Sequence, residues 1–225
     1  MDIKSSVRGP PCALYGTDTI GSMGIDLFLP ALLVAAGFMA LRLREQRQRI
    51  VLLASHLRHF QIEKLMENLT EGYLRGLGES EAGRREQVWQ LLGSTESALA
   101  GQVTRFAAGF AKVGSDEARV SRLPFTLPYA GRWLPRTTFD VRQAFAIHAR
   151  GLSEVAANAT GLSPRDKAFM MSAELFLMQH TCHWFCKSRT VASARLLARH
   201  RTSYDQVTAA VSPATRRDYL ALVKG

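Results

Sequence analysis

The residues best suited to carry chemistry lie in one short segment, HTCHWFC, at positions 180–186. It places two imidazoles, His180 and His183, beside two thiols, Cys182 and Cys186. Imidazole and thiolate are the ligands that zinc and other transition metals prefer, and neighbouring thiols can also undergo redox chemistry. The segment therefore raises a choice between a metal or redox site and the packed middle of a helix.

Helical geometry favours the packed helix. Cys182 and Cys186 are four residues apart and share a face with apolar residues such as Met178, where a free cysteine behaves as a small hydrophobic side chain. His180 and His183 point a quarter-turn or more away from that face. One straight helix can bring His183 and Cys186 to a metal but not all four side chains, and we expect no cofactor.

A metal site assembled across helices is the alternative. His56, His59 and Glu63 have helical spacing, and His148 and Glu174 lie in apolar surroundings. A di-metal carboxylate bundle needs Glu-x-x-His pairs on two helices, and the sequence has none. Candidate ligands for such a site are His180, His183, Cys182 and Cys186.

The segment 20–41, IGSMGIDLFLPALLVAAGFMAL, predicts one transmembrane helix. Asp26 is its only charged residue, and a full span needs about 20 mostly apolar residues. Two rival interpretations are a cleaved signal peptide, which would want basic residues before the apolar run, and a buried core helix. Residues 1–19 would be a short tail, and Met23 is an alternative start of translation.

The flanks of this helix predict its orientation. The sequence RLREQRQR follows it, with Arg42, Arg44, Arg47 and Arg49 against one acidic residue. Basic residues stay on the cytoplasmic side, so we expect the N-terminus outside, residues 42–225 in the cytoplasm, and these arginines on anionic lipid headgroups. The expected location is a bacterial inner membrane. Ala36 and Ala40 permit pairing of two such helices, and hence a homo-oligomer.

The remaining sequence, residues 42–225, predicts an all-α bundle of five or six helices. Apolar residues recur every three or four positions over 45–77, 81–113 and 138–158. The first two of these helices should form an antiparallel hairpin. Start signals at Ser163, Ser203 and Ser212 predict one helix that carries HTCHWFC and two shorter ones that close the chain.

A loop interrupts the helices at 121–137. Three prolines prevent a helix there, and aromatic residues alternate with arginines. Long loops of this kind are often functional, and aromatic and arginine side chains suit a membrane interface or a protein partner. The candidate partner-binding residues are Phe125, Tyr129, Arg132, Trp133 and Arg136.

The formal net charge of +10 favours anionic partners, either lipid or nucleic acid. The C-terminal region, with Arg216 and Arg217, faintly resembles a helix-turn-helix, but its turn is too short and has no glycine. Nucleic-acid binding stays an alternative that we do not favour. No phosphate-binding loop, nucleophile elbow or dinucleotide fingerprint is found. The sequence thus indicates a membrane-anchored adaptor or scaffold, without an enzyme activity, that holds an unknown protein partner.

Overall fold

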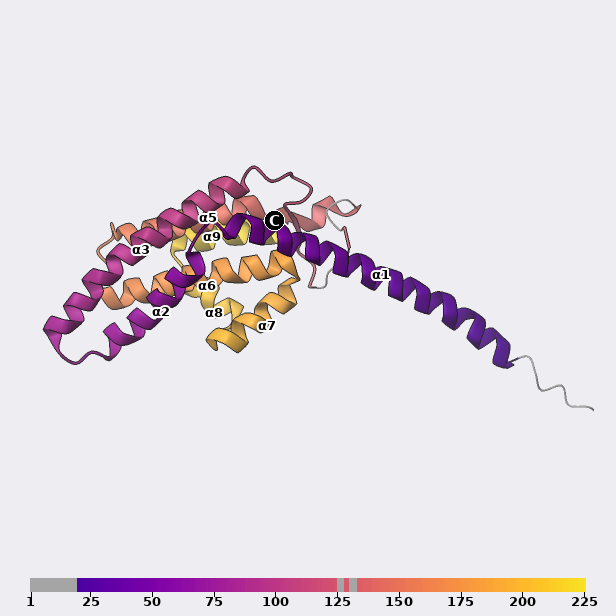
Figure 1. Cartoon of the computed structure of the whole chain (residues 1–225), viewed down its shortest axis with the longest axis horizontal. Coiled ribbons are helices and arrows are strands. Elements are labelled where there is room, and N and C mark those ends of the chain that lie inside the picture. The colour runs from indigo at the N-terminus through magenta and orange to yellow at the C-terminus, as the bar shows by residue number, and fades with distance from the viewer. Residues whose placement is uncertain (1–19, 125–127, 130–132) are drawn as a thin grey trace, which may run out of the picture. The chain divides into compact units, whose positions relative to one another are not determined.

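The computed structural model describes residues 20–124, 128–129 and 133–225, with side chains described from Phe28 onward. The chain divides into two units, residues 1–41 and 42–225. The described residues form eight α-helices, one 3-10 turn and two short strands (Figure 1): α1 (Ile20–Leu57), α2 (Ile62–Gly78), α3 (Ala82–Phe110), β1 (Arg119–Ser121), η1 (Pro135–Thr137), β2 (Thr138–Asp140), α5 (Val141–Ala157), α6 (Pro164–Cys186), α7 (Arg189–His200), α8 (Tyr204–Ala210) and α9 (Pro213–Lys224).

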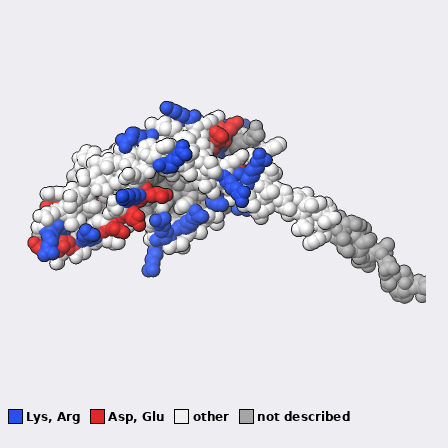
Figure 2. All heavy atoms as spheres, in the orientation of Figure 1, with Lys and Arg blue, Asp and Glu red and all other residues white. Residues whose placement is uncertain are grey.

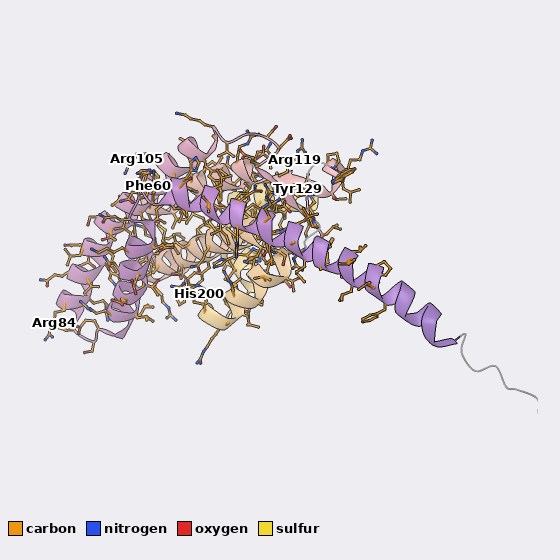
Figure 3. The ribbon with its side chains drawn as sticks, turned by 45° about the vertical axis from the view of Figure 1, so that its right-hand side comes forward. Phe60, Arg84, Arg105, Arg119, Tyr129 and His200 are labelled. Carbon is orange, nitrogen blue, oxygen red and sulfur yellow. The ribbon has the colours of Figure 1, made fainter. Side chains whose placement is uncertain are left out.

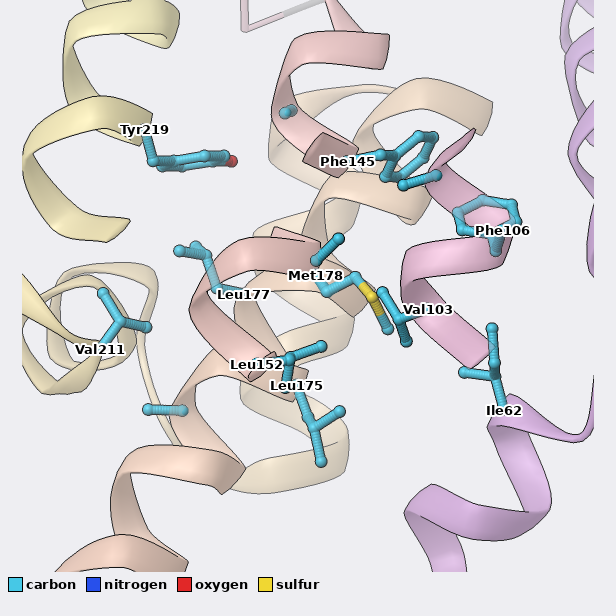
Figure 4. Close-up of a cluster of buried hydrophobic side chains, with 14 of the residues drawn as sticks. Ile62, Val103, Phe106, Phe145, Leu152, Leu175, Leu177, Met178, Val211 and Tyr219 are labelled. Carbon is cyan, nitrogen blue, oxygen red and sulfur yellow. The ribbon is translucent and has the colours of Figure 1, made fainter. Parts of the chain in front are cut away.

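The second unit is a helical bundle built around α5 and α6. Helix α5 packs against α3, α6 and α9, while α6 also contacts α7 and α8. Phe106, Phe145, Leu152 and Leu177 are buried in the shared core, and Figure 4 shows them converging from α3, α5 and α6. The prediction of an all-α bundle is confirmed.

The helix starts predicted from serine residues are confirmed. Ser163 accepts a hydrogen bond from the Asp166 amide, and Ser212 accepts one from the Thr215 amide. Ser203 forms a full capping box with Gln206. Each cap supplies an acceptor to an amide that has no partner within its own helix, which is why these boundaries are readable from sequence.

Three details of the prediction are wrong. The helix expected over 45–77 is interrupted between Leu57 and Ile62, where the chain turns back so that α2 can pair with α3. The helix expected from Thr138 starts at Val141, because residues 138–140 form β2 and pair antiparallel with β1. The described part of residues 42–225 also has more helices than the five or six expected, since the closing segment forms α7, α8 and α9.

Among the described residues, no helix has both the length and the apolar character that are needed to cross a membrane. The predicted span covers residues 20–41, of which 20–27 lie outside the described side chains.

A buried ion pair connects three helices. Glu96 of α3 is buried, accepts a 2.6 Å hydrogen bond from the Tyr73 hydroxyl of α2, and lies 2.5 Å from Lys167 Nζ of α6. The Lys167 side chain is only 16% exposed. Removing one member of such a pair leaves an uncompensated charge in a medium that solvates it poorly.

We expect Lys167→Met to lower the free energy of unfolding by about 3 kcal/mol, because Glu96 loses its counter-charge. Urea denaturation of the full chain measures this. The control is Arg84→Met, which removes a pair with Glu81 at the same 2.5 Å separation in an exposed position and should cost about 0.5 kcal/mol or less. The double variant Glu96→Gln/Lys167→Met should recover most of the loss; equal effects of Lys167→Met and Arg84→Met would contradict the interpretation.

Candidate functional site

A groove of about 810 Å³ lies between α1, the start of α2, α6 and α7, and the residues that line it all belong to 42–225. We call it the basic-rimmed groove. Its volume is in the range typical of small-ligand sites. The residues that line it are Ile50, Leu53, Ala54, Leu57, Arg58, Phe60, Gln61, Ile62, Glu63, Lys64, Met66, Met178, Gln179, Cys182, His183, Cys186, Lys187, Arg195 and Arg199.

The floor of the groove is apolar and contains flexible side chains. Leu53, Ile62 and Met178 are buried, and Leu57, Phe60 and Met66 are partly buried against the core. Two of these are methionines, whose flexible thioether side chains adapt to ligands of varied shape. Residues 58–61 separate α1 from α2, and Arg58, Phe60 and Gln61 of this break line the groove.

The rim carries five cations and one acidic residue: Arg58, Lys64, Lys187, Arg195 and Arg199, with Glu63. Within the described ranges, Arg58, Lys64, Arg195 and Arg199 make no ion pair with a carboxylate. Arg195 instead lies 3.1 Å from His183 Nδ1, and Lys187 donates to Gln46 Oε1 at 2.9 Å. These four cations therefore give the groove an excess of positive charge over Glu63, its one acidic lining residue.

Arg49 holds α1 against the rest of the bundle. Its guanidinium donates to the Phe185 carbonyl of α6 at 3.1 Å and to the Arg119 carbonyl of β1 at 3.0 Å. It also bonds Glu45 Oε1 at 2.7 Å, while Glu45 Oε2 accepts from the Tyr129 amide at 2.9 Å. Figure 3 shows Tyr129 and Arg119 on the same side of α1 as these contacts require. This cluster fixes the wall of the groove that α1 contributes.

The HTCHWFC segment divides between core and groove. His180, Thr181, Trp184 and Phe185 are buried, and the Trp184 indole donates to the Ser121 carbonyl at 2.9 Å. Cys182, His183 and Cys186 line the groove instead. The prediction of a packed helix is confirmed for His180, Thr181, Trp184 and Phe185. The two cysteines do share a face, as expected, but His183 lies beside them on the groove.

The thiols and His183 are poorly placed for nucleophilic or acid–base chemistry. Burial raises the pKa of Cys182 and raises that of Cys186 to about 11, so both are protonated at neutral pH. Burial, reinforced by Arg195 and Arg199, lowers the pKa of His183 and keeps it neutral. Of the side chains that the structure describes, no three of the types His, Cys, Asp or Glu are grouped so that they could hold a metal ion.

Two other histidines form a buried network between α5, α6 and the C-terminal helices. His148 Nε2 lies 2.9 Å from Thr181 Oγ1, which donates to the Leu177 carbonyl and lies 3.1 Å from the Tyr219 hydroxyl. Thr181 has one proton and two lone pairs, so His148 Nε2–H and the Tyr219 hydroxyl must both donate to it. His148 is then neutral, and its bare Nδ1 is one of several buried side-chain atoms without a hydrogen-bond partner in the described structure.

His180 has similar surroundings. Its Nε2 lies 3.1 Å from Ser193 Oγ, and its ring packs against Tyr204 and Trp184. Burial lowers the pKa of both His148 and His180 to about 3. Charging either ring would place an unpaired cation in the core, so both act as structural rings in the neutral state.

The predicted partner-binding loop extends from a β-ribbon. Strands β1 and β2 pair with Arg119 opposite Asp140 and close the base of the loop. Trp133 is 80% exposed and Arg136 is also exposed, whereas the Tyr129 backbone is fixed by Glu45. Phe125 and Arg132 lie outside the described residues.

The four arginines predicted to bind headgroups do not behave alike. Arg44 and Arg47 are exposed and Arg42 is partly exposed. The Arg49 side chain is only 15% exposed and is fully engaged in the cluster described above, so it acts inside the domain. Among the basic C-terminal residues, Arg216 and Arg217 are exposed, and Arg217 pairs with Asp218 at 2.8 Å.

Comparison with protein-family models, with curated proteins and with solved structures finds no match to this chain. Its function is therefore argued from its own residues. The basic-rimmed groove cannot be predicted from the sequence, because its cations come from α2, α7 and the residues that follow α1 and α6, and they converge only in the fold. The one available signal was helical spacing of Arg195 and Arg199, which puts both on one face of α7.

We expect Arg49→Gln to open the wall of the groove and to speed alkylation of Cys186 about tenfold, because two carbonyls lose a charged donor. Mass spectrometry of the Cys186 peptide after timed exposure to N-ethylmaleimide measures the rate. Arg49 also lowers the Cys186 pKa, so its removal alone would slow the reaction, and faster alkylation reports opening. The control Arg47→Gln, in an exposed position of the same helix, should leave the rate unchanged; unchanged alkylation in Arg49→Gln would contradict this role.

The buried histidines predict a loss of stability in mild acid. With folded pKa values of about 3 and unfolded values near 6.5, the unfolded chain binds more protons between these limits. The free energy of unfolding should thus fall by about 3–4 kcal/mol from these two residues between pH 7 and pH 5.

Glu174 acts in the opposite sense, since burial raises its pKa and its contribution to stability is lost as pH rises. The decisive quantity is therefore a difference between variants. His180→Asn should remove about half of the histidine-dependent slope in chemical denaturation at several pH values, whereas exposed His59→Asn should not. Parallel slopes for the two variants would contradict the assignment.

Proposed function

We propose that this protein is a membrane-anchored, non-catalytic adaptor or scaffold that holds a partner at the cytoplasmic face of a membrane. The observation that carries the proposal is the surface of α1 between Phe28 and Leu43. Its large apolar side chains are exposed: Phe28, Leu29, Leu32, Leu33, Val34, Phe38, Met39, Leu41 and Leu43.

These exposed side chains surround the helix. At 100 degrees per residue, Phe28, Leu33 and Val34 already point in three different directions. A helix that lies flat on a membrane would have one apolar and one polar face, whereas a helix that is apolar all round requires an apolar environment on every side. A lipid bilayer supplies that environment, with Pro30 close to one end of the segment, where its missing hydrogen bond costs least.

The adjoining arginines support the proposed orientation. Arg42, Arg44 and Arg47 follow the apolar segment directly and retain exposed surface. Each can contribute about 1 kcal/mol of attraction to anionic headgroups. We exclude Arg49 from this role because its guanidinium is engaged with Phe185, Arg119 and Glu45.

The partner-binding surface that we propose is the tip of the loop carried by the β-ribbon. Trp133 and Leu134 are 80% and 44% exposed, and Arg136 lies beside them. An exposed tryptophan next to an arginine has the composition of an interaction hot spot. The ribbon is anchored through Arg122, which donates to the Leu222 carbonyl of α9, so changes at the tip need not disturb the bundle.

The anchor is tested by cell fractionation and protease access. The intact protein should stay in the membrane pellet after an alkaline carbonate wash, because a spanning helix resists extraction. External protease should leave residues 42–225 intact in spheroplasts and digest them in inverted vesicles. Recovery of the intact chain in the soluble fraction would disprove the anchor, and digestion of 42–225 from outside would disprove the orientation.

The partner surface is tested with Trp133→Ala/Arg136→Ala. Both side chains are exposed, so the melting temperature should stay the same while proteins that co-purify from native membranes are lost. The matched control is Leu91→Ala/Arg84→Ala, which also removes one exposed apolar side chain and one exposed arginine, on α3. Identical co-purifying proteins in both variants would remove the loop from the proposal.

A further inference from the structure

We propose that the basic-rimmed groove is a binding site for an anionic single-chain lipid such as a fatty acid. Its hydrocarbon chain would lie on the apolar floor, and its head group would bind Arg195 and Arg199 at the edge formed by α7. This ligand site does not depend on the membrane anchor, because all the residues that form it belong to 42–225.

The floor suits a hydrocarbon chain. It is formed by aliphatic and thioether side chains from three helices, including Leu53, Leu57, Met66 and Met178. Cys182 and Cys186 add two weakly polar thiols, which burial keeps in the protonated, uncharged form. Covering this surface with an acyl chain removes apolar area from water on both sides.

The rim suits an anion. Arg58, Lys64, Arg195 and Arg199 outnumber Glu63 on the rim, and the charges of Arg195 and Arg199 add to burial in lowering the His183 pKa. Both arginines are exposed, so their donors are accessible to a ligand. A guanidinium bonds a carboxylate through two parallel N–H groups, which gives the head group a defined position as well as charge compensation. Figure 2 shows basic side chains spread over the visible face of the bundle.

A second recess differs from the basic-rimmed groove in the charges of its lining residues. That recess, of about 720 Å³, is lined by Arg47 and Arg49 but also by Glu45, Asp116 and Glu117. Its mixed charges compensate one another and favour no single ligand sign. The basic-rimmed groove differs in having both an apolar floor and an excess of one charge, which together match an anionic amphiphile.

The size of the groove favours a slender occupant over a partner helix. A helix is 10–12 Å across, so a volume of 810 Å³ corresponds to about 1.3 to 1.9 turns of it, fewer than two. Helix-in-groove recognition uses apolar anchors spread over at least two full turns, with further contacts beyond them. An acyl chain is far narrower than a helix, and the volume accommodates it with its head group at the rim.

Photo-crosslinking tests the site in the full-length protein, held in phosphatidylcholine vesicles. The probe is palmitic acid that carries a diazirine on its chain, and the comparison is the matching alcohol, which has the same chain without the charge. We expect the acid to label peptides that contain residues 50–66 and 178–199, at about ten times the yield of the alcohol at equal concentration. Only the acid has a carboxylate that can pair with the rim arginines.

Two double variants test whether labelling depends on the rim arginines or only on the net charge of the protein. Arg195→Gln/Arg199→Gln should lower labelling of these peptides about tenfold. The control Arg216→Gln/Arg217→Gln removes the same charge from the exposed face of α9 and should label normally. Circular dichroism verifies that each variant is folded; if the rim variant is not, the acid–alcohol comparison in the unaltered protein still decides.

An independent readout is the His183 ring. Burial lowers the His183 pKa most, and Arg195 and Arg199 lower it further; a carboxylate bound between these arginines should offset their part and raise the pKa, which NMR titration of the imidazole with and without palmitate measures. Labelling confined to residues 20–43, equal labelling by the alcohol, or an unmoved His183 pKa would each overturn the proposal. If fractionation instead places the protein in the soluble pool, the same labelling is run without vesicles, so failure of the anchor is distinguished from failure of the site.

Discussion

The cluster around Arg49 is the interaction on which the arrangement of residues 42–225 depends. One guanidinium connects α1 to the end of α6 and to β1, and Glu45 connects α1 to the backbone of the loop at Tyr129. Among the α1 side chains that the structure describes, Leu53 is the one large aliphatic residue that is buried, and Leu52 and Leu57 pack against the core only in part. The position of α1 therefore rests largely on charge-assisted hydrogen bonds, which are directional and fix geometry more sharply than apolar burial does. Without them, the groove would lose one wall.

Helix α6 serves the core and the groove with different faces of one sequence. Its residues toward α5 and α9 form a buried polar network, in which Thr181 satisfies both His148 and Tyr219. Such a network is stable only when nearly every donor has an acceptor, so it specifies one packing of α5, α6 and α9. Gly151 permits that packing, because a Cβ at this position would overlap Thr215 Oγ1 and Glu174 Oε2. A neighbouring face of α6 presents Met178, Cys182 and Cys186, which line the groove and do not take part in this network.

The sequence predicts the helical class and most helix starts, because periodicity and capping are local properties. Ser163, Ser203 and Ser212 each signal their own helix. The sequence does not predict the break at 58–61, because the apolar residues from Ile50 to Tyr73 keep a helical period across it. The turn is stabilised by the pairing of α2 with α3, which is a tertiary contact. The sequence also does not predict the β-ribbon, because strands of three residues are too short to show an alternation of apolar and polar side chains. The role of Arg49 cannot be read from a row of four similar arginines, because its partners lie 70 and 136 positions away.

Charge is the property that unites the two proposed activities of the molecule. The chain has an excess of 10 positive charges. Some of its arginines are paired with carboxylates within the fold, as Arg142 is with Asp140 and Arg49 is with Glu45. Cations without a carboxylate partner among the described residues include Arg42, Arg44 and Arg47, where α1 follows its apolar segment, and Arg195 and Arg199 of α7 on the groove. A folded protein maintains such local repulsion only at a cost in stability, and an anionic ligand removes that cost on binding. Lipid headgroups can do this at Arg42, Arg44 and Arg47, but Arg195 and Arg199 adjoin an apolar floor, so the ligand that relieves them best brings its own hydrocarbon.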